Sequence, residues 1–174
     1  MNDDAISSIL IIAVLLLFSA YFSATETAFS SLNRTRLRTM AEKGNSKAAL
    51  ALSLAEKYDQ LLSSILVGNN VVNIAMSSIS TLLFVRLMPD IGATVSTIVI
   101  TIVVLIFGEI SPKSLAKENP EKFAMVSAPI IRVVIWVLTP INFLFAQWKK
   151  LLGRIFKGGD AHRMTQDELV MLVD

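Results

Sequence analysis

Cysteine is absent from this sequence of 174 residues, and His162 is its only histidine. Without thiols the chain can form neither disulfide bonds nor thiolate metal sites, so soft metals lose their usual ligands. An intramembrane enzyme is also disfavoured, because Glu26 in the first apolar segment has no histidine near it in the sequence and His162 lies in the polar tail. We therefore expect no catalytic residues, and any bound metal is expected to be a hard cation.

Apolar residues, in contrast, are abundant. They make up 53% of the chain, and its mean hydropathy is +0.62, whereas about 45–50% is usual for soluble domains even when glycine is counted. The lipid bilayer is therefore the expected solvent. The net charge of +2 does not indicate nucleic-acid binding, because the basic residues flank the apolar segments and do not cover a separate domain with aromatic residues.

Three apolar segments are long enough to cross a bilayer as helices, since about 20 apolar residues suffice. The first lacks the basic start and the cleavage site of a signal peptide, so we expect it to remain in the mature protein. The predicted fold is an all-α integral membrane domain, residues 1–156, with cytoplasmic juxtamembrane helices between and after the spans. The spans are expected at residues 5–32, 61–85 and 93–112, and the juxtamembrane helices at about 34–58 and 119–156.

The distribution of lysine and arginine predicts the orientation of these spans. The segment after the first span is rich in basic residues, whereas the loop after the second contains only Arg86. Basic loops face the cytoplasm, so the N-terminus should lie outside and the C-terminal side in the cytoplasm. Residues 123–148 are apolar enough for a fourth crossing, but that crossing would place the basic residues of 149–157 outside. We therefore favour in-plane or re-entrant helices there, followed at 157–174 by a linker and the start of a cytosolic helix.

Polar residues share one face of the first span. Ser19, Ser23 and Glu26 are spaced by four and three residues, which places them on the same side of a helix. One explanation is structural: serine hydroxyls can bond to the preceding turn, and a glutamate near the helix end can form a salt bridge. The other is functional, because ionisable residues inside a membrane are costly and commonly mark ion pathways.

The second span contains three amides within two turns, Asn69, Asn70 and Asn73, next to Gly68. Hydrogen bonding between helices readily explains one asparagine at such depth. Three of them beside a glycine are also typical of an oxygen-lined site for a hard cation. The sequence leaves both interpretations open.

The third span ends in a motif that should expose a backbone oxygen. Pro112 has no N–H, so the carbonyl of Gly108, four residues earlier, loses its helical partner. Unpaired carbonyls at membrane depth are tolerated where they are buried in protein or line a cavity, and they can coordinate cations there. Glu109 adds a carboxylate beside that carbonyl. The alternative is a plain helix end at the membrane interface.

These donors are all oxygens, from hydroxyl, amide, carboxylate and main-chain groups. Such a set suits Mg²⁺, Ca²⁺, Mn²⁺ or Na⁺ better than zinc or copper. Periodicity alone does not choose among these ions.

At these same residues the sequence resembles the transmembrane domain of the CNNM/CorC magnesium transporters. A further C-terminal segment resembles the one that leads to cytosolic CBS domains in that family. The matching segments are residues 22–29 with Ser19 ahead of them, 68–73, 108–113 and 165–173.

The resemblance implies a homodimer in the lipid of the inner (plasma) membrane that exports Mg²⁺, with a Na⁺ gradient as the proposed driving force. ATP would act only through CBS domains beyond this chain. The alternative function is a non-transporting membrane anchor or magnesium sensor within a larger regulatory protein. The implied metal ligands are Ser19, Ser23, Asn70, Asn73, Gly108 and Glu109, with Glu26, Asn69 and Pro112 in supporting roles and Asn69 kept as an alternative ligand.

Overall fold

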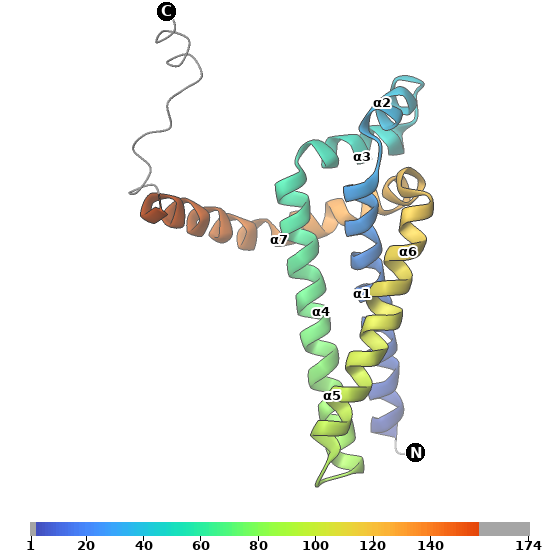
Figure 1. Ribbon diagram of the computed structural model, residues 1–174, viewed down its shortest axis with the longest axis vertical. Helices are drawn as coiled ribbons and strands as arrows, with labels where there is room; N and C mark the ends of the chain where they lie inside the picture. Colours follow the sequence, from blue (N-terminus) through green and yellow to red (C-terminus); the bar gives the residue numbers. More distant parts are fainter. Residues whose placement is uncertain (1–2, 157–174) are drawn as a thin grey trace, which may run out of the picture. The chain divides into compact units, whose positions relative to one another are not determined.

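The computed structural model describes residues 3–156, and every element within that range is a helix (Figure 1). The linker and helix start predicted at 157–174 lie outside the described residues. The elements are α1 (Asp3–Ser31), α2 (Arg34–Glu42), α3 (Ser46–Glu56), α4 (Tyr58–Leu87), α5 (Gly92–Val103), the π-helical segment η1 (Val104–Ile110), α6 (Ser111–Glu118) and α7 (Pro120–Phe156).

Four of the described helical segments are long and apolar enough to cross a membrane, as judged by length and composition. They agree with the prediction of an all-α integral membrane protein. They also include one candidate more than the three spans expected, and that candidate is the first part of α7. The four segments are Asp4–Ser31, Tyr58–Leu87, Gly92–Glu118 and Pro120–Pro140.

Three long helical rods lie side by side within residues 3–118 (Figure 1). They are α1, α4 and a continuous third rod built from α5, η1 and α6, and α1 packs against both of the others. The third rod runs on through Pro112 to Glu118, so the helix does not end at the proline as the sequence suggested. Pro112 lies in the first turn of α6, two residues after the end of the π-helical segment.

The turn between α4 and α5 is held by two close contacts. The buried hydroxyls of Ser80 and Ser96 lie 2.9 Å apart and hydrogen bond to each other. Gly92 packs against α4 so tightly that a Cβ atom there would lie 2.4 Å from the carbonyl oxygen of Phe84. These contacts fix the two helices as an antiparallel pair.

The α2–α3 pair is bounded by side-chain caps. Asn33 begins α2 by accepting a hydrogen bond from the backbone N–H of Arg36, and Asn45 begins α3 in the same way through Lys47 and Ala48. Between them Gly44 has a φ of 89°, a left-handed conformation that glycine adopts at little cost. Leu37 and three alanines of α3 are buried in the core that this pair shares with α1.

The chain divides into two units, residues 1–137 and residues 138–174, each described by itself. In the first unit the beginning of α7 packs into the core through Ala124, Ala128 and Ile131. Tyr21 of α1 donates a hydrogen bond to the carbonyl of Ser127 at 3.0 Å. In Figure 1 this part of α7, drawn in orange, runs across the direction of α1 and α4. The second unit continues α7 as a helix to Phe156.

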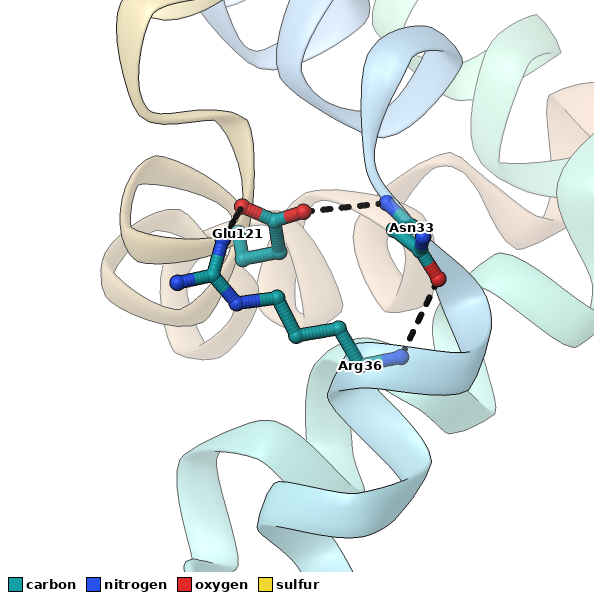
Figure 2. Close-up of polar contacts among 3 residues, drawn as sticks. All are labelled: Asn33, Arg36 and Glu121. Carbon is teal, nitrogen blue, oxygen red and sulfur yellow. Dashed lines mark hydrogen bonds and ion pairs between the residues drawn. The ribbon is translucent and has the colours of Figure 1, made fainter.

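Glu121 connects the start of α7 to the junction of α1 and α2 (Figure 2). One of its carboxylate oxygens accepts a hydrogen bond from the backbone N–H of Asn33 at 3.2 Å. The other forms an ion pair with Arg36 at 3.6 Å. Because Glu121 also lies in the first turn of α7, its charge interacts favourably with the positive end of that helix.

Candidate cation site

Ser19 is the point at which α1 meets the asparagines of α4. Its side chain is fully buried, and its hydroxyl oxygen lies 2.8 Å from the amide oxygen of Asn73 and 3.2 Å from that of Asn69. A hydroxyl carries one proton and can donate a full hydrogen bond to only one of these oxygens at a time. Three oxygens therefore gather around one proton, which leaves acceptor capacity for a cation.

Ser23, one turn further along α1, has a buried hydroxyl with no hydrogen-bond partner. Its side chain is 1% exposed, and among the described residues its hydroxyl is the only fully buried side-chain oxygen or nitrogen atom without a hydrogen-bond partner. The hydroxyl of Thr25, which is also fully buried, donates a hydrogen bond to the carbonyl of Tyr21 at 2.7 Å. An unsatisfied buried donor costs about 1–3 kcal/mol. In a native protein such a group calls for a water, an ion or a functional role.

The third rod approaches Ser19 through Gly108. Gly108 is buried, and a Cβ atom there would lie 3.0 Å from the Ser19 hydroxyl oxygen. The backbone of η1 thus passes within contact distance of the serine, and a side chain would crowd it. The absence of a side chain at Gly108 therefore lets η1 lie directly against Ser19.

The π-helical segment follows from the proline that ends it. In an α-helix the N–H of residue 112 would bond the carbonyl of Gly108, but Pro112 has no N–H. The helix widens instead, and the N–H of Ser111 reaches back five residues to the carbonyl of Ile106. Single π-helical turns occur frequently at functional sites. The sequence predicted the lost bond at Gly108 but not the widened turn, although a proline inside one long apolar helix is the signal for it.

The three asparagines of α4 do not face the same way. Asn69 and Asn73 are four residues apart and both reach Ser19, whereas Asn70 lies on the exposed side of α4. Nearby Gly68 lets α1 and α4 approach, since a Cβ atom there would lie 2.7 Å from the ring of Phe22. The glycine in this motif therefore serves helix packing.

The two glutamates also differ. Glu26 pairs with Lys113 at 3.3 Å, so the salt bridge suggested for it by its position near the end of α1 is present. Glu109 is half-buried and makes no side-chain hydrogen bond or ion pair within residues 3–156. Glu109 is thus available as a ligand, whereas Glu26 is already neutralised by a cation of the protein.

The donor set around Ser19 and Ser23 fits a hard cation. In residues 3–156 no three His, Cys, Asp or Glu side chains come together as a metal site. What does come together is the Ser19 hydroxyl, two amide oxygens and the backbone at Gly108, with the unpartnered hydroxyl of Ser23 one helical turn further along α1. Oxygen ligands of this kind suit Mg²⁺, Ca²⁺ and Na⁺. With an orphaned hydroxyl among the donors, the arrangement can accept a small cation without first losing a hydrogen bond at Ser23.

Comparison with known proteins gives relatives over nearly the whole chain. Residues 10–174 match the family model described as the cyclin M transmembrane N-terminal domain, CNNM. A UPF0053 protein of Haemophilus influenzae is 40% identical over 156 residues, which cover 89% of this chain and 37% of that protein. The UPF0053 inner membrane protein YfjD of Escherichia coli is 41% identical over 137 residues, covering 79% of this chain and 32% of that protein.

A plant protein extends the comparison. A chloroplastic DUF21 domain-containing protein of Arabidopsis thaliana is 33% identical over 171 residues, covering 94% of this chain and 25% of that protein. The chain therefore spans only a quarter to somewhat over a third of the length of these relatives. The match to the family model confirms the resemblance seen in the sequence motifs, and the chain belongs to the CNNM (cyclin M) transmembrane domain family.

Proposed function

We propose that this chain is the ion-conducting part of a magnesium transporter. The observation that carries the proposal is the buried, unpartnered hydroxyl of Ser23, next to the oxygens that converge on Ser19. Mg²⁺ requires near-octahedral coordination at about 2.0–2.1 Å and gives up its waters reluctantly, so it needs several fixed oxygens at once. Rigid helices that hold hydroxyl, amide and main-chain oxygens together can meet that need.

The ligands we propose are Ser19, Ser23, Asn69, Asn73 and the carbonyl of Gly108, with Glu109 as the nearest unpaired carboxylate. Asn69 replaces Asn70 in this set because Asn69 reaches Ser19. Magnesium is the transported substrate here, and the site would bind it after partial dehydration. Export from the cell and coupling to Na⁺ remain part of the proposal through the family resemblance.

We further propose three crossings, with the N-terminus outside and the first part of α7 in the plane of the inner leaflet. The direction of residues 120–137 in Figure 1 supports this arrangement. So does the outward face of that segment, where Val126, Ile130, Val133 and Trp136 are exposed beside the cation of Arg132. An amphipathic helix with a tryptophan on its apolar face is suited to the membrane interface.

A homodimer is the assembly that we propose. Asn70 lies exposed on α4 among apolar residues such as Val71 and Ile74. An amide on the lipid-facing side of a membrane helix gains from a partner on another helix. A second copy of the chain packed against this face of α4 would supply one.

Two measurements on the full-length protein test the transporter proposal. Thermal stability is recorded against MgCl₂ concentration for the wild type, for Ser23→Ala and for Ser78→Ala, an exposed serine that only bonds its own helix. Mg²⁺ flux is then measured in liposomes with and without an opposing Na⁺ gradient. We expect Ser23→Ala alone to lose the Mg²⁺ response and the flux, because it removes one of the oxygens needed to replace water.

The second candidate function is a membrane anchor or magnesium sensor without transport. It is favoured by the hydrogen bonds of Ser19 to Asn69 and Asn73, which by themselves account for packing between α1 and α4. A sensor would keep the Ser23-dependent stabilisation by MgCl₂ and show no flux. An anchor would show neither, and an equal response of wild type and Ser23→Ala to MgCl₂ would contradict the proposed site.

A further inference from the structure

The ion pair of Glu26 and Lys113 lies at the accessible end of the polar face of α1. Ser19 and Ser23 are buried, whereas the side chains of Glu26 and Lys113 are 29% and 39% exposed. Glu26 follows Ser23 by three residues and so lies on the same side of α1. A cation that approaches the buried hydroxyls from this end meets the ion pair first.

The ion pair and the contact between Ser19 and Gly108 both lie along the interface between α1 and the rod of η1 and α6. Gly108 lies against Ser19, and five residues later Lys113 lies against Glu26, so η1 and α6 run alongside α1 in the same direction. Ser23 is placed on α1 between these two contacts. In the order along α1, the residue with the unpartnered hydroxyl thus comes after the contact with Gly108 and before the contact with Lys113.

Lys113 holds the position that a cation would take at Glu26. The ammonium is a compact charge on a flexible four-carbon stem, so it can leave the carboxylate without moving the helix. A half-exposed ion pair of this kind is weak, because water screens both charges. A divalent cation interacts with the same carboxylate through twice the charge and can displace the lysine.

We propose that Lys113 is a tethered competitor for the transported cation, and that Glu26 is the carboxylate that receives the cation first at the mouth of the site. With no cation present, Lys113 neutralises Glu26 and keeps an unpaired carboxylate from lying beside the buried hydroxyls. An arriving cation displaces the ammonium to the surface and is then passed inward to Ser23. This inference rests on the proposed function, since it assigns a role at the mouth of that same site.

The test is a titration of the full-length protein with MgCl₂ at low ionic strength, with thermal stability as the readout. Lys113→Met removes the competitor, and we expect its half-saturating MgCl₂ concentration to fall roughly fivefold, the range that the loss of a half-exposed ion pair allows. Glu26→Gln should raise that concentration. The double variant should behave as Glu26→Gln does, because Lys113 competes only where the carboxylate is present.

Two controls separate competition from a general effect of charge or packing. Lys113→Arg keeps the cation and should titrate like the wild type. Arg36→Met removes a positive charge from the Arg36–Glu121 pair, which is formed by α2 and α7 and not by the polar face of α1. Arg36→Met should leave the half-saturating concentration unchanged.

A purely structural ion pair gives a different result. Lys113→Met would then lower the melting temperature without MgCl₂ and leave the half-saturating concentration as in the wild type, which overturns the proposal. Failure of both Lys113→Met and Lys113→Gln to fold would overturn it as well. If wild type and Ser23→Ala respond alike, the site itself is wrong. If Ser23→Ala loses the response while Lys113→Met titrates like the wild type, only the role of Lys113 is wrong.

Discussion

Two regions of the helical bundle contain the same residue types, glycine and buried serine, but differ in whether the serine hydroxyls are hydrogen bonded. At the α4–α5 turn, Ser80 and Ser96 are buried and satisfy each other, and Gly92 allows the helices to touch. Around Gly108, a glycine again allows close approach and serines are again buried, but the Ser23 hydroxyl is left without a partner. Serine and glycine by themselves therefore do not mark a site. The difference lies in whether every polar atom has been satisfied.

The glycines give the largest expected effect in this comparison. Gly92→Ala places a methyl group 2.4 Å from the main-chain carbonyl oxygen of Phe84, which cannot move independently. We expect it to lower the free energy of unfolding by about 3 kcal/mol, at the upper end of overpacking costs. Gly108→Ala meets the Ser19 hydroxyl at 3.0 Å and should cost less, because a side chain can rotate away. Denaturation in mixed detergents measures the unfolding free energy of both variants. Equal losses in Gly92→Ala and Gly108→Ala would contradict the expected difference between a backbone contact and a side-chain contact.

The paired hydroxyls come next. Ser80→Ala leaves Ser96 buried without its partner, so we expect a loss of about 1–2 kcal/mol in unfolding free energy. The double variant Ser80→Ala/Ser96→Ala removes both polar groups and should recover most of that loss. The same denaturation experiment checks this, and an additive double variant would mean that the pair does not act as a mutual hydrogen bond.

Removing the unpartnered hydroxyl of Ser23 should not lower the unfolding free energy, in contrast to removing the paired hydroxyl of Ser80. Ser23→Ala removes a buried polar group that has no partner, so in the absence of Mg²⁺ we expect unfolding free energy to stay the same or to rise by up to about 1 kcal/mol. Measured without divalent cations, this variant is the only one at a buried position of the series that is expected not to lose stability. A clear loss would indicate that the hydroxyl has a partner in the unliganded protein.

The smallest effect is expected for an exposed serine. Ser78 bonds the carbonyl of Ile74 in its own helix, and surface changes of this kind usually stay within about 0.5 kcal/mol. Ser78→Ala therefore sets the baseline for the series. A larger change in the melting curve would indicate that this face of α4 is buried against another chain.

The sequence was sufficient for much of the fold because its signals are local. Long uncharged runs predicted membrane helices, and the spacing of Ser19 and Ser23 placed them on one face of α1, where the structure also has them. Pro112 predicted that Gly108 would lose a hydrogen-bond partner. Each of these inferences needs only the covalent chain and helix periodicity.

What the sequence left open depends on contacts between distant segments. The choice between Asn69 and Asn70 is a rotation of about 100° around α4, which only the position of α1 decides. The partner of Glu26 could not be chosen among the many lysines and arginines before α6 was placed beside α1. The sequence also did not predict that the third rod continues through Pro112, because the continuation depends on the π-helical segment η1.

That segment also sets the phase of the rod in which it lies. One surplus residue in a helix turns everything after it by about 100° relative to an unbroken helix. Before η1, the rod contacts α4 through Gly92 and Ser96. From η1 onward, it packs against α1. One continuous helical rod thus packs against α4 with one face and against α1 with another face. Deleting one residue between Val104 and Ile110 would remove the surplus residue, so Lys113 would keep its side of the rod facing Glu26 while the widened turn that contains Gly108 was lost.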